Sequence, residues 1–195
     1  MSPPTLHLAG RSTPSNPAGP NTWSGAPIAR ENLGPNEKLL HFCRHAQGTH
    51  NINPTLNKSP DSHDARLTDD GKHQCAQLQK KTNDLRPQLV VSSPLTRTLQ
   101  SAALCFGPQS SAAGAPLMAL EHVRETVNFL CDGRRSITAI KADLDFGSSI
   151  DFSQIQHDED FIWASYEQRY GNQEAYCKLR ESECATAQTT RAPTC

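Results

Sequence analysis

The chain has 195 residues, which is enough for one domain with a hydrophobic core and too few for two ordinary domains. Its 19 basic and 20 acidic residues give a net charge of −1, which excludes a strong electrostatic field for nucleic acids or membrane surfaces. The seven cysteines are odd in number and form no C-x-x-C pair, so we expect a reducing compartment and neither a disulfide framework nor a zinc site. No apolar run reaches the roughly 18 residues of a membrane span.

The N-terminal part of the chain is rich in Pro, Gly, Ser and Asn without periodicity, which predicts a disordered, low-complexity segment at 1–36. A single domain at 37–180 and a disordered polar tail at 181–195 complete the predicted organisation. Residues 1–30 contain no Asp or Glu, a weak resemblance to an organelle transit peptide. We expect a cytoplasmic protein, with a plastid or another organelle as the alternative.

Strands and helices alternate along the predicted domain. The apolar run at 39–43 predicts a buried parallel strand, and a helix is predicted over 69–85. A second strand at 89–91 leads into a second helix at 95–102, and a third strand is predicted at 117–120. This succession is the signature of an α/β domain with a mostly parallel sheet and right-handed crossovers.

Local signals define the helices in more detail. Thr68 is the expected N-cap of the first helix, which we expect to end before Pro87. In the second helix the apolar stripe leaves Arg97 and Gln100 off the predicted buried face. After residue 135 the pattern degrades into an irregular region with one helix, and a further helix is predicted at 166–180.

Reactive side chains follow all three predicted strands. Ligands of open parallel sheets bind at the carboxyl ends of the strands, where this chain carries Arg44 and His45, then Arg97, then Glu121 to Glu125. An imidazole can attack phosphorus, guanidinium groups can hold phosphoryl oxygens, and a carboxylic acid can protonate the departing oxygen. The strand ends therefore predict a site for phosphoryl transfer that needs no metal or other cofactor.

Three sequence motifs match this placement: LHFCRHAQGTHN at 40–51, LTDDG at 67–71 and SSPLTRTLQSA at 92–102. Together with EHVRE at 121–125 and CDGRRS at 131–136 they resemble the histidine phosphatase superfamily, and within it the phosphoglycerate mutase-like proteins of plants, algae and fungi. The resemblance covers about 39–174. It implies a three-layer α/β/α fold with a mostly parallel sheet, of which this chain lacks the C-terminal strand and helix.

The resemblance also implies roles for individual residues. His45 is the expected nucleophile and forms a phosphohistidine, while Arg44 and Arg97 bind the phosphoryl group. Glu125 is the expected proton donor, with Glu121 as the alternative. Asn51 is either a polar contact of the pocket or a residue that caps its own loop. The expected substrate is a small phosphorylated molecule; no nucleic acid and no membrane is an expected partner, and no oligomeric state is predicted.

One departure from the family pattern bears on activity. The family carries a second histidine in a Ser/Thr-His-Gly/Ser motif, but this sequence has no histidine after His157, which lies in an acidic stretch and is expected to be exposed. Loss of one donor that stabilises transition-state charge costs on the order of 10²–10³ in rate. We therefore expect a phosphatase-type hydrolase whose catalysis is impaired.

Three other hypotheses stay open at this point. A phosphate-binding or interaction module would keep the pocket without turnover. A mutase would transfer the phosphoryl group between hydroxyls, although the Glu-Arg-His-Tyr-Gly pattern of glycolytic mutases does not follow Glu125. A metal site of Cys43, His45 and His50 lacks the spacing of metal ligands and is the weakest of the three.

Overall fold

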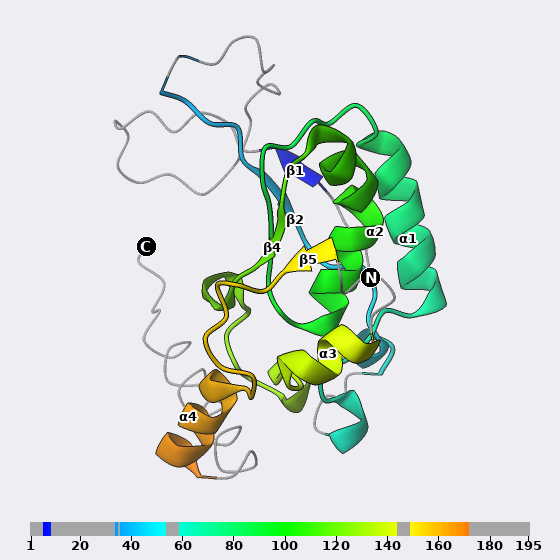
Figure 1. The fold of residues 1–195 in the computed structure, drawn as a ribbon. Coiled ribbons are helices and arrows are strands. Elements are labelled where there is room, and N and C mark those ends of the chain that lie inside the picture. Colours follow the sequence, from blue (N-terminus) through cyan, green and yellow to red (C-terminus); the bar gives the residue numbers. More distant parts are fainter. Residues whose placement is uncertain (1–5, 9–33, 35, 54–58, 144–148, 172–195) are drawn as a thin grey trace, which may run out of the picture. The chain divides into compact units, whose positions relative to one another are not determined.

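A computed structural model of the chain describes residues 6–8, 34, 36–53, 59–143 and 149–171 (Figure 1). The chain forms two compact units, Met1–Arg44 and His45–Cys195, which are described one at a time. In the N-terminal unit, strand β1 (Leu6–Leu8) pairs antiparallel with strand β2 (His41–Cys43), and His7 lies opposite Phe42.

The N-terminal unit differs from the sequence prediction in two respects. The predicted strand at 39–43 exists as β2, but it pairs with β1 instead of joining the parallel sheet, and 61 % of Phe42 is exposed. A short apolar run predicts a strand without specifying its partner, which explains the error. Strand β1 lies within 1–36, where the sequence predicts disorder; the rest of that segment, apart from residues 34 and 36, lies outside the described residues.

The C-terminal unit contains a parallel sheet, as predicted. The strands lie in the order β3 (Val90–Ser92), β4 (Leu117–Ala119) and β5 (Ile150–Asp151). Strand β5 was not predicted because its two residues are too few to show an alternating pattern. The α/β class is therefore confirmed, and β5 is the third member of the sheet instead of β2.

Two long helices pack beside this sheet. Helix α2 (Thr96–Ala113) contacts β3 and β4, and helix α1 (Asp69–Lys81) packs against α2, as Figure 1 shows. The Thr68 hydroxyl accepts the Gly71 N–H at 2.9 Å, which confirms the predicted N-cap. Helix α1 ends four residues before the prediction, at the point where the Thr82 hydroxyl donates to the Leu78 carbonyl at 3.0 Å.

The prediction that Arg97 and Gln100 face away from the core was wrong. Arg97 is 1 % exposed and Gln100 is 8 % exposed. The Gln100 Oε1 accepts the Leu67 N–H at 2.8 Å. A backbone group 33 residues away in sequence therefore supplies the hydrogen-bond partner of this buried side chain. An apolar stripe assigns polar residues to solvent, and it contains no information about partners that arrive from elsewhere in the chain.

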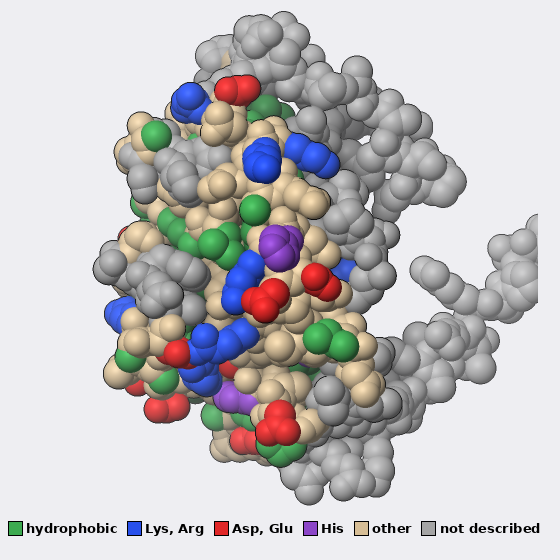
Figure 2. Space-filling model, turned by 90° about the vertical axis from the view of Figure 1, so that its right-hand side faces the viewer, with side chains coloured by type: hydrophobic (Ala, Val, Ile, Leu, Met, Phe, Trp, Pro, Cys, Tyr) green, Lys and Arg blue, Asp and Glu red, His purple; other side chains and the backbone are tan. Residues whose placement is uncertain are grey.

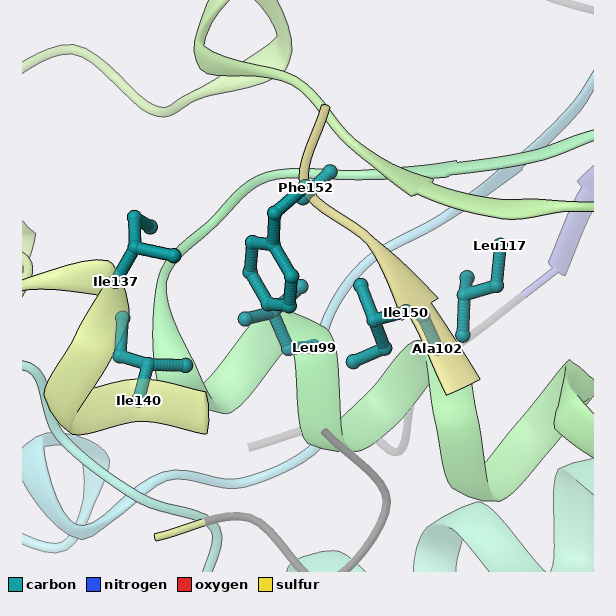
Figure 3. Close-up of a cluster of buried hydrophobic side chains, with 8 residues drawn as sticks. Leu99, Ala102, Leu117, Ile137, Ile140, Ile150 and Phe152 are labelled. Atoms are coloured by element: carbon teal, nitrogen blue, oxygen red, sulfur yellow. The ribbon is translucent and has the colours of Figure 1, made fainter. Parts of the chain in front are cut away.

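The hydrophobic core lies between α2, the sheet and helix α3 (Ile137–Asp143) (Figure 3). Its buried members come from all of these elements: Leu99, Ala102, Leu117, Ala119, Ile137, Ile140, Ile150 and Phe152. Burying a Leu, Ile or Phe side chain contributes about 1.5–3 kcal/mol. The region after residue 135, which the sequence predicts as irregular with one helix, therefore supplies half of this core through α3, β5 and Phe152.

The last described helix is α4 (Phe161–Tyr170). The Asp160 carboxylate caps it by accepting the Trp163 N–H at 2.9 Å, and Gly171 follows with φ of 85°. The sequence places this helix at 166–180, but it begins five residues earlier, and residues 172–180 lie outside the described part. Among the described helices, none has the length and apolar character to cross a membrane.

Candidate functional site

His45 is oriented by the backbone beside it. Its Nδ1 lies 2.7 Å from the Ala46 carbonyl oxygen. A carbonyl only accepts hydrogen bonds, so Nδ1 carries the proton and the lone pair of the neutral ring lies on Nε2. The ring is partly exposed, and its Nε2 is the atom with the electronic structure of a nucleophile.

The loop after His45 is attached to both long helices. The Ala46 N–H donates to Ser101 of α2 at 3.0 Å, and the Gln47 N–H donates to Gln74 of α1 at 3.0 Å. The Gln47 carbonyl in turn accepts the Thr68 N–H at 3.0 Å. These bonds join the start of α1, the middle of α2 and the histidine loop into one rigid arrangement, as a positioned nucleophile requires.

Asn51 caps its own loop. Its Oδ1 accepts the Gly48 N–H at 3.0 Å within the short helix η2 (Thr49–Asn51). His50 of the same helix is 7 % exposed, and its ring centroid lies 5.4 Å from that of His45. A Cβ at Gly48 would lie 2.7 Å from the His50 ring, so the glycine makes room for this imidazole. Asn51 therefore makes the hydrogen bond of a loop cap, and its role as a polar contact of the pocket stays a prediction.

Arg97 lies at the centre of a buried ionic cluster. Its Nη2 is 3.0 Å from Asp132 and 3.5 Å from Glu125, and its Nη1 donates to the Cys131 carbonyl. The Ser101 hydroxyl that holds the histidine loop also donates to the Arg97 carbonyl, at 2.8 Å. The arginine and the anchor of the histidine loop are therefore one helical turn apart on α2.

The two candidate acids have different surroundings. Glu121 accepts Arg134 Nε at 2.7 Å and Arg124 Nη1 at 3.1 Å, and its side chain is 20 % exposed. The Glu125 side chain is 57 % exposed, and its carboxylate lies 3.5 Å from Arg97 Nη2. Two arginines bind the Glu121 carboxylate, whereas one arginine contacts Glu125. Glu125 is therefore the more accessible of the two carboxylates.

A second ionic cluster lies beside the first. The Arg124 guanidinium, 3 % exposed, binds both carboxylate oxygens of Asp160, at 2.8 and 2.6 Å. Burial alone raises the pKa of Asp160, but hydrogen bonds from Arg124 and from the Trp163 and Arg134 backbones outweigh it and hold the pKa below its usual range. Asp160 thus links Arg124 to the backbones of Arg134 and Trp163 and stabilises this part of the fold.

The structure distributes the predicted site residues as follows. It brings Arg97 and Glu125 into contact, and it links the His45 loop to the same helix through Ser101. Arg44 is exposed and is the last residue of the N-terminal unit. His157 is exposed, as predicted, and stacks on Phe161.

Sequence reasoning missed two carboxylates of this region. Asp132 binds Arg97, and Asp64 accepts the Thr96 N–H at 2.8 Å at the start of α2. The signal for Asp132 was present, since it belongs to the CDGRRS segment. No comparable signal marks Asp64, which reaches a helix start 32 residues away.

The charges of this region are mixed. On the face drawn in Figure 2, basic and acidic side chains lie next to one another, consistent with the near-zero net charge. Within the described ranges, no group of three or more His, Cys, Asp or Glu side chains could hold a metal ion.

The family model of the histidine phosphatase superfamily (branch 1) matches residues 40–155. The chain belongs to this superfamily. The match contains all five predicted site residues, and membership supports phosphohistidine chemistry of the phosphatase or mutase type. The α/β fold of the structure thus agrees with membership of this superfamily.

Relatives of this chain include three proteins of Arabidopsis thaliana. Phosphoglycerate mutase-like protein is 33 % identical over 159 residues, covering 65 % of this chain and 58 % of the relative. Phosphoglycerate mutase-like protein 2 is 33 % identical over 184 residues, covering 65 % of this chain and 53 % of the relative. The chain thus spans little more than half the length of these relatives. No solved structure matches it.

Proposed function

We propose that this histidine phosphatase binds small phosphomonoesters and that His45 Nε2 is the nucleophile. The observation that carries the proposal is the contact of His45 Nδ1 with the Ala46 carbonyl, which fixes the tautomer whose lone pair lies on Nε2. The attachment of the same loop to α2 supports it, because Arg97 lies one turn away on that helix.

The proposed reaction has two steps. In the first, a bond forms between Nε2 and phosphorus while the ester P–O bond breaks, and Glu125 donates a proton to the departing alkoxide. In the second, water attacks phosphorus while Glu125 takes a proton of the water, the P–N bond breaks with its electron pair returning to His45 Nε2, and inorganic phosphate leaves. Positive charge from Arg97, and from Arg44 by the family resemblance, stabilises the phosphoryl oxygens in both steps.

Phosphate binding without turnover is a second candidate. In this case Arg97 and His45 bind the anion, and no acid-labile intermediate accumulates.

A single labelling experiment separates the two candidates. The purified chain is incubated with a ³²P-labelled phosphomonoester and quenched in alkali, and the protein is analysed for acid-labile phosphate. We expect a labelled histidine in the wild type and none in His45→Ala. Isothermal titration with inorganic phosphate on the same samples reports binding.

His157→Ala is the matched control, because His157 is an exposed histidine outside the site. It should keep the wild-type level of label. Binding of phosphate without label supports the second candidate. A wild-type chain that neither binds phosphate nor becomes labelled contradicts both.

A further inference from the structure

We propose that Asp132 is a positioning residue that fixes the guanidinium of Arg97 for the phosphoryl group. The inference rests on the proposed phosphate site and adds a residue to it. Asp132 lies in the short helix η6 (Leu130–Asp132), 35 residues beyond Arg97 in sequence. The two side chains are 6 % and 1 % exposed, so their ion pair is shielded from water.

The backbone holds the Asp132 carboxylate in place. Its Oδ2 accepts the Asn128 N–H at 3.1 Å and the Phe129 N–H at 3.0 Å, while Oδ1 accepts Arg97 Nη2 at 3.0 Å. One carboxylate oxygen therefore binds the backbone of its own loop, and the other binds the arginine. A carboxylate fixed in this manner defines the orientation of the planar guanidinium that it binds.

The two acidic partners of Arg97 Nη2 are not equivalent. Glu125 is 57 % exposed and lies 3.5 Å away, at the limit of a hydrogen bond, whereas Asp132 is buried and lies 3.0 Å away. A phosphoryl oxygen can replace the exposed carboxylate without moving the buried one. Asp132 then keeps the arginine in position while Glu125 becomes available to the leaving group.

Arg97 also retains an unused donor. Its Nε is buried and has no hydrogen-bond partner among the described residues, whereas Nη1 and Nη2 both donate to protein acceptors. A buried donor without an acceptor is unusual and unfavourable. An anion that accepts the Arg97 Nε–H would relieve this cost; Arg124 Nε is in the same state, so an orphan Nε alone does not mark a site.

Asp132→Asn tests this role selectively. The amide oxygen of asparagine can still accept the two backbone N–H groups, but its NH₂ group then faces Arg97 and donor meets donor. The matched control is Asp160→Asn. Asp160 is also a buried aspartate bound by one arginine and by two backbone N–H groups, those of Trp163 and Arg134, but it does not contact Arg97.

Binding of inorganic phosphate to the full chain is measured by isothermal titration, and the stability of each variant by urea unfolding. Losing a charge-assisted hydrogen bond weakens binding by about tenfold to hundredfold. We expect this loss in Asp132→Asn and a change of less than about twofold in Asp160→Asn, although both variants lose stability. Loss of stability alone therefore does not explain the difference in affinity.

Each outcome decides one point. Equal phosphate affinity in the wild type and Asp132→Asn, or equal losses in both variants, overturns the positioning role and leaves the proposed function intact. No phosphate binding by the wild type overturns the proposed function and this inference with it.

If Asp132→Asn does not fold, ¹⁵N-arginine NMR of the wild type replaces it. The Arg97 signals are assigned from the Arg97→Lys spectrum. Hindered rotation of the Arg97 guanidinium and a phosphate-dependent shift of its Nε–H support the role. Free rotation overturns it.

Discussion

Gly71→Ala is expected to destabilise the protein even though alanine is the better helix former. Gly71 lies in the first turn of α1, and a Cβ there would lie 2.2 Å from the Gln47 carbonyl oxygen and 3.1 Å from its carbon. Real Cβ atoms essentially never approach other atoms closer than 3.0 Å, so helix and loop must separate. The substitution therefore acts on the contact between α1 and the histidine loop.

The magnitude follows from opposing contributions. Replacing glycine by alanine in a helix contributes about 1 kcal/mol of stability. Overpacking against fixed backbone costs about 1–3 kcal/mol, and the Thr68 N–H bond to the Gln47 carbonyl at 3.0 Å, worth about 1 kcal/mol, is strained as well. We expect a net loss of about 1–3 kcal/mol in the free energy of unfolding.

Gly107→Ala provides the matched control within α2. Among the described residues, no atom apart from the chain neighbours and the backbone of its own helix lies within 4 Å of the position that its Cβ would occupy. Helix propensity favours the alanine by about 1 kcal/mol and the following Pro108 opposes it, so stability should change by less than about 1 kcal/mol. Both variants are measured by urea unfolding at pH 7. If Gly71→Ala is as stable as Gly107→Ala, the close approach of α1 to the Gln47 carbonyl does not exist in solution and the reasoning fails.

Two further predictions concern titrating groups. The pKa of Asp160 is lowered in the folded state, so its contribution to stability is present above about pH 4, the usual pKa of an aspartate, and is lost as pH falls through the lower folded value. Asp160→Asn should therefore lose about 3 kcal/mol at pH 7 and far less at pH 2, as measured by urea unfolding; a loss independent of pH contradicts the ion pair with Arg124. Burial and the nearby Asp132 charge raise the pKa of the Cys131 thiol to about 12, so iodoacetamide at pH 8 should modify Cys131 only after unfolding; modification of the folded protein contradicts this burial.

Local sequence signals predicted the elements that depend on neighbours in sequence. The Thr68 cap, the start of α1 and the strands β3 and β4 are of this kind, because each depends on residues within a few positions. The Arg44-His45 pair in the segment at 40–51 likewise indicated His45 as the candidate nucleophile. The roles of His45, Arg44, Arg97 and Glu125 stay predictions that the proposed experiments address.

Contacts between distant residues decided the rest. The burial of Arg97 depends on Cys131 and Asp132, and the capped start of α2 depends on Asp64. A helical hydrophobic pattern contains information only about the spacing of residues in one segment. It therefore predicted, wrongly, that Arg97 faces solvent. The pairing of β2 also lies beyond local reasoning, since an apolar run does not specify which strand will hydrogen-bond with it.

The sequence by itself therefore determined the superfamily motifs and the identity of the candidate nucleophile. Only the tertiary structure showed that Glu121 contacts two arginines and Glu125 contacts one. It also showed that Asn51 caps its loop and that Asp132 holds Arg97. The physical reason is common to all three: the charge and hydrogen bonding of a polar side chain are set by partners that folding brings together.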